Sequence, residues 1–294
     1  MSDGLIDGMA RRRLLGEGVE IDALVGGSGP PLLLLHGYPQ TRIIWKAVAP
    51  QLLQRFTVVA PDLRGYGRSG AGTGFEQASK RVMAADVRAV MRALGHERFA
   101  VLGHDRGGRV GYRLALDAPE VVSRLAVLDI VPTAEVWAAM DAQTAVAMFH
   151  WPFLAQKTGL PQRLIGADPL LFLHSELERM AAPGFRFDPA AMADYAAGFT
   201  DPAGVKGACD DYRAGWEIDP KLDEADRAAG RRITAPLLVL WGEEGSLKTT
   251  PDPLAVWRRW ADDVRGHVVP GGHFVPEEAP DALLAEALPF FSDT

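Results

Sequence analysis

Residues 103–107, with the sequence Gly-His-Asp-Arg-Gly, are the segment best suited to chemistry. A nucleophile two residues from a glycine on either side is typical of a sharp turn between a strand and a helix that exposes the central side chain. The central residue here is Asp105, where esterases and lipases have serine. A carboxylate is already ionised at pH 7, and it can attack a saturated carbon with a leaving group or a strained-ring carbon. The segment therefore predicts substitution at an alkyl carbon rather than esterase or peptidase chemistry.

His273 is the predicted base that would act with this nucleophile. It lies in Pro-Gly-Gly-His-Phe (270–274), just after the last apolar run that predicts a strand. In a parallel sheet, that position is at the same carboxyl edge as Asp105. The order nucleophile, acid, histidine along the chain also agrees with this role.

The acid that orients this histidine has two candidate positions. Asp129 ends the apolar run 125–128, and a carboxylate there calls for a polar partner. Glu243 and Glu244 follow the apolar run 237–240, where related sequences often place an aspartate at the position of Gly245. We assign Asp129, with Glu243 or Glu244 as the alternative.

Two arginines follow the nucleophile on one helical face. Arg106 opens the predicted helix, where the helix dipole disfavours a cation, and Arg109 lies one turn later. Local rules are most often broken at functional sites. Two guanidinium groups beside a carboxylate nucleophile would bind a second carboxylate and lower the pKa of Asp105. The sequence therefore predicts an anionic substrate; the alternative is that Arg109 faces solvent or pairs with an acidic residue.

Backbone donors for the carbonyl oxygen of the ester are expected near the segment His-Gly-Tyr-Pro (36–39). The N–H groups of Tyr38 and Arg106 would face this oxygen. His36 is predicted to stabilise its turn, and the glycine-rich segment 62–69 is predicted to be structural.

Alternating strands and helices must position these residues. Residues 12–25 predict an antiparallel hairpin, and six apolar runs predict buried parallel strands. The runs are Leu32–Leu35, Thr57–Ala60, Phe99–Leu102, Leu125–Leu128, Leu237–Leu240 and Gly266–Val269. The stretches between them predict helices, for example at Lys80–Leu94, Arg109–Asp117 and Leu254–Ala261. This alternation predicts an α/β fold, with a mostly parallel sheet and helices on both faces.

The alternation stops near Pro132 and resumes near Pro236. The residues between are rich in Ala, Met, Phe and Trp, and their Pro and Gly clusters predict breaks between short helices. We therefore expect a core of residues 1–132 and 231–294 with an inserted helical cap, or lid, at 133–230.

Composition excludes several classes of function. The 294 residues carry a formal net charge of −7, which disfavours nucleic acid and anionic membranes as partners. The chain has no apolar run of membrane-spanning length and no export signal, and one cysteine cannot form an intrachain disulfide. We expect a cytoplasmic protein without a metal or cofactor.

Several segments resemble the fluoroacetate (haloacetate) dehalogenases of the α/β-hydrolase superfamily. The resemblance extends over nearly the whole chain. Its most specific part is the strand-to-helix turn at residues 103–107, the nucleophile elbow, together with both arginines. The similar segments are Gly103–Arg109, His36–Pro39, Leu128–Pro132, Gly272–Phe274, Phe149–Trp151, Asp211–Gly215, Asp252–Arg258 and Pro276–Pro280.

The resemblance implies an α/β-hydrolase fold and a two-step reaction. Asp105 would displace halide from the α-carbon of a 2-halo acid whose carboxylate is bound by Arg106 and Arg109. His273, oriented by Asp129, would then activate water to hydrolyse the ester to the 2-hydroxy acid. The resemblance also implies a homodimer.

The same resemblance assigns three cap residues to the halide. His150, Trp151 and Tyr212 match the family's halide-binding His, Trp and Tyr, whose N–H and O–H groups would stabilise the departing fluoride. The chain departs from the family near Met180, where relatives carry an aromatic residue, which predicts a roomier pocket.

Two related activities are alternatives. An epoxide hydrolase would use the same Asp, His and acid with two cap tyrosines, for which the cap offers Tyr195 and Tyr212. The position that matches the usual first tyrosine reads His150-Trp151. A haloalkane dehalogenase usually has Trp after the nucleophile, whereas Arg106 favours a charged substrate.

Overall fold

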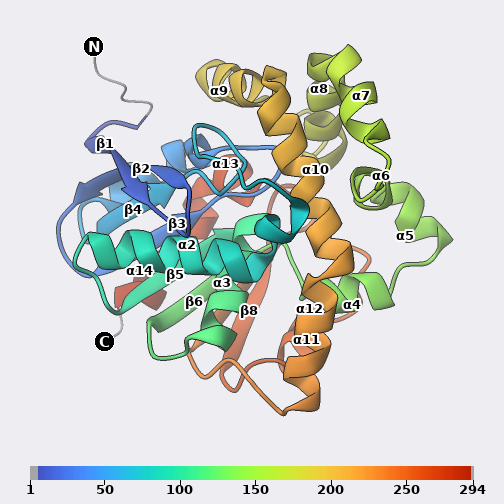
Figure 1. Cartoon of the computed structure of the whole chain (residues 1–294). Helices are drawn as coiled ribbons and strands as arrows, with labels where there is room; N and C mark the ends of the chain where they lie inside the picture. Colours follow the sequence, from blue (N-terminus) through green and yellow to red (C-terminus); the bar gives the residue numbers. More distant parts are fainter. Residues whose placement is uncertain (1–5, 293–294) are drawn as a thin grey trace.

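An eight-stranded sheet forms the centre of the computed structural model, which describes residues 6–292 (Figure 1). The strand order is β1-β2-β4-β3-β5-β6-β7-β8. The β1–β2 and β2–β4 pairs are antiparallel, and all other pairs are parallel. The strands are β1 (Met9–Leu15), β2 (Glu20–Gly27), β3 (Pro31–Leu35), β4 (Thr57–Pro61), β5 (Phe99–His104), β6 (Val122–Leu128), β7 (Leu237–Gly242) and β8 (Val264–Val269). The predicted hairpin and all six predicted parallel strands are confirmed.

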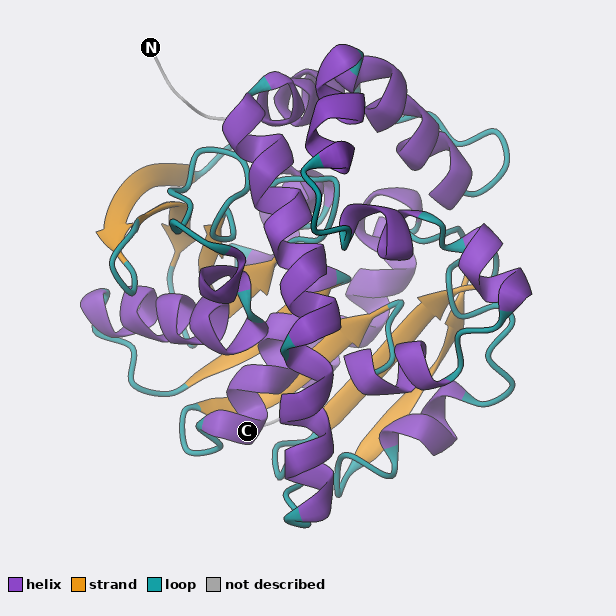
Figure 2. Cartoon of the chain, turned by 45° about the vertical axis from the view of Figure 1, so that its right-hand side comes forward, coloured by secondary structure: helices purple, strands orange, loops and turns teal. Residues whose placement is uncertain are grey.

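The central strands are apolar because both of their faces are covered. Every residue of β5 is buried, whereas the edge strand β8 exposes several of its side chains. In Figure 1, α2 (Lys80–Ala93) and α3 (Arg106–Asp117) lie in front of the sheet, and the C-terminal helix α14 (Pro280–Ser292) lies behind it. Figure 2 shows the strands as one twisted layer among these helices.

The remaining helices outside the β6–β7 segment are short. They are η1 (Arg42–Ala47), α1 (Ala49–Leu52), η2 (Phe75–Ala78), α12 (Pro253–Trp257) and α13 (Val275–Glu278). Three predicted helix spans differ slightly from the structure. α2 ends at Ala93 rather than Leu94, and α12 spans 253–257 rather than 254–261. α3 begins at Arg106, the residue expected to open it, rather than at Arg109, where the helix-like run begins. The early start of α3 follows from the tight turn at Asp105, which leads directly into the helix.

Eight helices connect β6 to β7. They are α4 (Thr133–Ala138), α5 (Ala142–Ala147), α6 (His150–Leu154), α7 (Leu160–Ala167), α8 (Pro169–Met180), α9 (Pro189–Thr200), α10 (Pro202–Glu217) and α11 (Asp219–Ala228). In Figure 1, α6 to α9 lie above the sheet, and α11 descends beside it. No helix within residues 6–292 is long and apolar enough to cross a membrane.

The strand order reverses direction at the centre of one sheet edge. β4 and β5 lie on opposite sides of β3, so the loops after β3 and β5 diverge at this point. Ligands of open α/β sheets bind outside the carboxyl ends of the strands where such a reversal occurs. The segment 36–39 and Asp105 both lie there.

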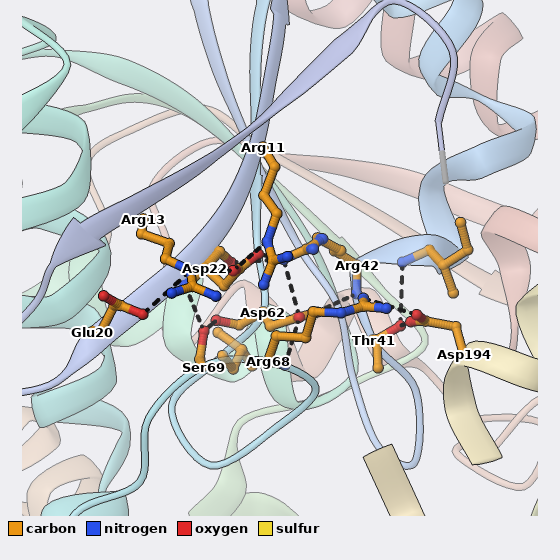
Figure 3. A network of polar contacts seen from close by, with 12 residues as sticks. Arg11, Arg13, Glu20, Asp22, Thr41, Arg42, Asp62, Arg68, Ser69 and Asp194 are labelled. Carbon is orange, nitrogen blue, oxygen red and sulfur yellow. Dashed lines mark hydrogen bonds and ion pairs between the residues drawn. The ribbon is translucent and has the colours of Figure 1, made fainter. Parts of the chain in front are cut away.

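A buried polar network holds the turn after β4 against β2 (Figure 3). The guanidinium of Arg42 donates to the carboxylates of Asp22 and Asp62, and all three side chains are at most 1% exposed. Asp62 also accepts from the N–H of Arg68, 3.0 Å away. These contacts give the segment 62–69 the structural role that its sequence predicts.

Two aspartates of the helical segment bind the sheet-forming part of the chain. Asp194 of α9 accepts hydrogen bonds from Thr41 Oγ1 (2.5 Å) and Arg68 Nη1 (2.9 Å), as Figure 3 shows. Asp211 of α10 is fully buried and contacts three donors. These are Lys80 Nζ, Tyr66 Oη (2.7 Å), and the guanidinium of Arg106 (Nη2 to Oδ1, 2.6 Å).

Asp211→Asn is expected to lower the free energy of unfolding by about 3–5 kcal/mol, because two buried cations lose their counter-charge. Urea unfolding measures the change. The neighbouring variant Asp210→Asn is a matched control, since Asp210 pairs with the half-exposed Lys206 at the surface and its loss should cost less than about 1 kcal/mol. Equal costs for the two variants would contradict this account.

Candidate functional site

Asp105 stands at a strained turn between β5 and α3. Its φ of 44° and ψ of −115° are rare for a residue with a side chain. The helix comes very close to β3 here: a Cβ added to Gly107 would lie 2.2 Å from the carbonyl oxygen of Leu35. The sequence-predicted elbow is therefore present, and its carboxylate is 5% exposed.

The loop after β3 lies against this carboxylate. The N–H of Tyr38 donates to Asp105 Oδ2 over 2.9 Å, as expected for one of the two predicted backbone donors. A Cβ added to Gly37 would lie 2.5 Å from the Cβ of Asp105, so only glycine allows the approach. His36 keeps the loop in place, donating to Gly37 O (2.9 Å) and accepting from a backbone N–H of residue 63 (2.9 Å).

Nearby positive charges keep Asp105 ionised. Burial alone would raise the pKa of its carboxyl group. The charges of His273, Arg106 and Arg109 outweigh burial and lower this pKa to about 2. A buried carboxylate that remains charged and has few water contacts is suited to nucleophilic attack.

His273 and Asp129 form a hydrogen-bonded pair beside the nucleophile. Nδ1 of His273 donates to Asp129 Oδ2 over 2.6 Å, which leaves Nε2 free to act as a base. Burial lowers the pKa of His273, but the hydrogen bond and charge of Asp129 and the charge of Asp105 raise it above its usual value. His104 donates from Nε2 to the carbonyl oxygen of His273 (2.8 Å) and holds its backbone.

Space as well as hydrogen bonding selects Asp129 as the partner of this histidine. A Cβ added to Gly245 would lie 2.4 Å from Asp129 Oδ1, so the carboxylate fills the space that a side chain at position 245 would need. Ser246 donates to Asp129 Oδ2 from both its N–H and its hydroxyl, each at 2.7 Å. Glu243 and Glu244 are exposed, and Glu244 pairs with Lys248.

Arg106 lies fully buried beside the nucleophile. Its Nε and Nη2 bind the carboxylate of Asp211 (3.0 and 2.6 Å), and its Cζ lies 4.3 Å from the ring centre of Tyr212. Nη1 is buried and has no hydrogen-bond partner within residues 6–292. A buried guanidinium N–H without an acceptor costs folding free energy, and a bound ligand could supply that acceptor.

Arg109 is held one helical turn further on. Its Nη1 donates to Val131 O (2.9 Å) and Thr133 Oγ1 (3.2 Å), and its Cζ lies 4.7 Å from the ring centre of Trp151. Nε is buried and also unpaired within the described part of the chain. Arg109 is 3% exposed and therefore does not face solvent, and its side-chain hydrogen bonds within the described residues go to Val131 and Thr133 rather than to an acidic residue.

Four aromatic rings, from Tyr38, His150, Trp151 and Tyr212, pack together near the arginines. Tyr212 meets Tyr38, His150 and Trp151 edge to face at centroid distances of 5.0, 5.4 and 5.8 Å. All four rings are at most 4% exposed. The sequence-predicted cap residues are therefore brought to the site residues of the sheet.

Two of these rings keep their hydrogen-bond donors. Burial and the charge of Asp105 raise the pKa of Tyr212 well above its usual range, so the phenol retains its proton. Burial and the charge of Arg179 lower the pKa of His150, so the imidazole is neutral.

Some residues at the site give no signal in the sequence. Asp211, Lys80 and Ser246 have unremarkable neighbours in the chain, although Asp211 begins one of the segments that carry the family resemblance. The second candidate tyrosine, Tyr195, is not part of the ring cluster; its hydroxyl accepts from Gln40 Nε2 over 3.2 Å.

Gly245→Ala should lower the free energy of unfolding by about 1–3 kcal/mol, because its methyl group collides with the carboxylate of Asp129. In an Asp129→Gly background the same change should cost little, and a double-mutant cycle from urea unfolding measures the difference. Gly166→Ala in α7 is the control, since no atom lies within 4 Å of the added Cβ. An unchanged cost in the Asp129→Gly background would refute the steric argument.

Comparisons with known proteins agree with this geometry. The chain is 43% identical to the fluoroacetate dehalogenase of Burkholderia sp over 98% of its own length and 96% of that protein. It is 34% identical to the soluble epoxide hydrolase of Corynebacterium sp. (strain C12), with 94% of each chain covered. The resemblance expected from the sequence is thus confirmed.

A solved structure and a family model extend the agreement to the fold. The crystal structure of an alpha/beta hydrolase from Nostoc sp PCC 7120 superposes with a TM-score of 0.94 at 45% identity, covering 97% of this chain and 99% of the other. The family model described as "alpha/beta hydrolase fold" matches residues 30–280. The predicted fold class is confirmed, and the chain belongs to the alpha/beta hydrolase family.

Proposed function

We propose that the protein hydrolyses short 2-halocarboxylic acids, including fluoroacetate, to the 2-hydroxy acid and halide. The observation that carries the proposal is a carboxylate nucleophile next to two buried arginines, each with an unpaired guanidinium nitrogen. This arrangement suits a substrate whose reacting carbon is adjacent to a carboxylate. The 43% identity to a fluoroacetate dehalogenase supports the same substrate class.

In the first step, Asp105 attacks the α-carbon and halide leaves with the bonding electrons. Arg106 and Arg109 hold the substrate carboxylate and offset its repulsion from Asp105. Asp211 fixes the fork of Arg106, so that the unpaired Nη1 is available to the ligand. A guanidinium held in place in this way orients the substrate before the reaction begins.

His150, Trp151 and Tyr212 donate hydrogen bonds to the departing halide. Neutral imidazole, indole and phenol groups gain most when negative charge develops on the halogen. Fluoride depends most strongly on such donors, because it is a poor leaving group and a strong hydrogen-bond acceptor.

In the second step, His273 removes a proton from water, which attacks the carbonyl carbon of the ester. Asp129 orients the imidazole and stabilises the imidazolium that forms. The N–H of Tyr38, already on Asp105 Oδ2, stabilises the oxyanion. As the intermediate collapses, the imidazolium of His273 returns its proton to the departing alkoxide oxygen, which releases the 2-hydroxy acid. Asp105 then loses the remaining proton to solvent and is a carboxylate again.

The helices of residues 133–230 act as a lid over a core of residues 1–132 and 231–294. The contacts of Asp194 and Asp211 support this arrangement, because they hold the inserted helices against the sheet-forming part of the chain. The lid excludes water from the charged site. The roomier pocket at Met180, the homodimer and the cytoplasmic location remain predictions.

Epoxide opening is the second candidate, because a relative of that name is 34% identical. It requires acidic groups that protonate the ring oxygen. Tyr212 is close enough to Asp105 for that charge to raise its pKa, whereas the hydroxyl of Tyr195 hydrogen-bonds with Gln40 and Glu277 and lies outside the ring cluster. The geometry therefore favours the halo acid.

Purified protein should release halide and glycolate in equal amounts from fluoroacetate and chloroacetate, measured by ion chromatography. Asp105→Asn should abolish release. His273→Asn should release about one halide per enzyme and retain the ester, seen as added mass on the intact protein, because only the second step needs the base. His267→Asn, at an exposed histidine of β8 that pairs with Glu286, is the control and should form no lasting ester. Opening of an epoxide without halide release from either acid would refute the proposal.

The two steps should differ in their dependence on pH. The pKa of Asp105, about 2, keeps the nucleophile ionised throughout the neutral range, so the halide burst should change little between about pH 5 and pH 9. His273 must be unprotonated to act, and its pKa is raised, so ester hydrolysis should slow as the pH falls through that pKa. Ester formation removes the charge of Asp105, one cause of the raised pKa, and so favours the neutral form of His273 when the base is needed.

Rapid-quench experiments would resolve the burst from the hydrolysis step, and intact-mass measurements would follow the ester. Accumulation of the ester in acid is the expected result. If the burst and the hydrolysis lost rate together, the base would be acting in the first step instead.

A further inference from the structure

The Nδ1 atom of His150 lies between two charged side chains of α8. Arg179 Nη2 is 2.8 Å from it, and Glu176 Oε2 is 3.5 Å from it. The two neighbours favour different proton positions. Glutamate would accept a hydrogen bond from a protonated Nδ1, whereas arginine can only donate a hydrogen bond to an unprotonated Nδ1.

Distance decides between these neighbours. The contact with Arg179 has hydrogen-bond length, and the contact with Glu176 is too long for a strong hydrogen bond. A guanidinium remains protonated and has no acceptor, so Nδ1 must present its lone pair. In the neutral ring, the single proton then resides on Nε2.

Other contacts immobilise Arg179 in this position. Its Nη2 also donates to Glu176 Oε2 (2.7 Å), its Nη1 donates to Ala147 O (2.6 Å), and its Cζ lies 5.5 Å from the ring centre of Phe149. Glu176 is 1% exposed and serves as the buried counter-ion. The guanidinium therefore cannot easily turn away from His150.

The ring plane of His150 is fixed as well. It stacks on Tyr38 with an interplanar angle of 7° and a centroid distance of 5.8 Å, and it meets Tyr212 edge to face at 5.4 Å. Tyr38 in turn holds Asp105 through its N–H. The tautomer and the orientation of the ring are thus set by different neighbours.

We propose that Arg179 is a positioning residue that selects the Nε2–H tautomer of His150 and so makes this ring a hydrogen-bond donor to the leaving halide. The halide part rests on the proposed function, whereas the tautomer does not. With the proton on Nδ1 instead, Nε2 would present a lone pair to the halide and repel it. Arg179 itself touches neither substrate nor nucleophile.

The direct test is ¹⁵N–¹H NMR of protein labelled at the histidine ring nitrogens, with the His150 signals assigned by their loss in His150→Asn. Wild-type protein should show a neutral ring with its proton on Nε2. In Arg179→Met, Glu176 becomes the only neighbour of Nδ1, which should acquire a proton. Arg179→Lys keeps a cationic donor and should retain the wild-type tautomer.

Arg213→Met is the matched control variant. Arg213 of α10 has a similar exposure, an ion pair with Glu217 (2.8 Å) and a ring contact with Phe75 (3.9 Å), but it contacts no histidine within the described residues. It should leave the His150 signals unchanged.

Halide release gives the second measurement. Arg179→Met should lower fluoroacetate turnover by about 10- to 100-fold and chloroacetate turnover by much less, because the lost donor matters most to fluoride. Arg179→Lys should recover most of the loss, and Arg213→Met should preserve the ratio of fluoride to chloride release. A purely structural role for Arg179 would lower both turnovers equally.

A proton on Nδ1 in the wild-type protein, or an unchanged tautomer in folded Arg179→Met, would overturn the proposal. If Arg179→Met does not fold, the wild-type and Arg179→Lys spectra still decide, since Nδ1 must be unprotonated in both. Failure of the wild-type protein to release halide from any halo acid would instead refute the proposed function and leave the tautomer result standing.

Discussion

The structure depends on keeping a buried carboxylate charged. Asp105 is 5% exposed, and burial by itself would raise the pKa of its carboxyl group and disfavour the charge. Arg106, Arg109 and His273 prevent this, but each is buried and needs a partner of its own. Asp211 supplies one for Arg106, and Asp129 supplies one for His273. Since a buried charge is stable only when it is paired, the nucleophile requires a network of alternating charges that reaches from the elbow to Lys80.

This network also joins the inserted helices to the site. Asp211 belongs to α10, and Arg106 belongs to α3, so the ion pair that supports the charge at Asp105 is also a contact between the two parts of the chain. The next residue, Tyr212, is thereby placed over the guanidinium and beside the rings of Tyr38 and His150. Movement of α10 away from the sheet would remove a counter-ion and a hydrogen-bond donor together. The position of α10 and the charge balance at Asp105 are therefore coupled electrostatically.

Local features made much of this predictable from sequence. Apolar runs identified the parallel strands, the elbow identified Asp105, and the glycine at 245 indicated Asp129 as the acid, for which the structure adds a steric reason. Charge pairs between distant residues could not be predicted. Lys80 and Asp211 are 131 residues apart, and Lys80 at the start of α2 has the appearance of a solvent-exposed cation until the fold buries it. His150 and Trp151 were assigned through family resemblance, because aromatic residues in a helical segment also suit a packed core.

In the proposed reaction, the distribution of charge across the site gives a reason for placing neutral groups at the halogen. The proposal assigns the substrate carboxylate to the guanidiniums of Arg106 and Arg109, and the halogen to the uncharged donors His150 and Tyr212. A third cation at the halogen would attract the anionic substrate and both anionic products, which raises affinity without selecting the transition state. A neutral donor gains little from a carbon-bound halogen and much more from a departing halide. Arg179 contributes by preventing protonation at Nδ1, so a positive charge outside the pocket keeps the ring inside it neutral.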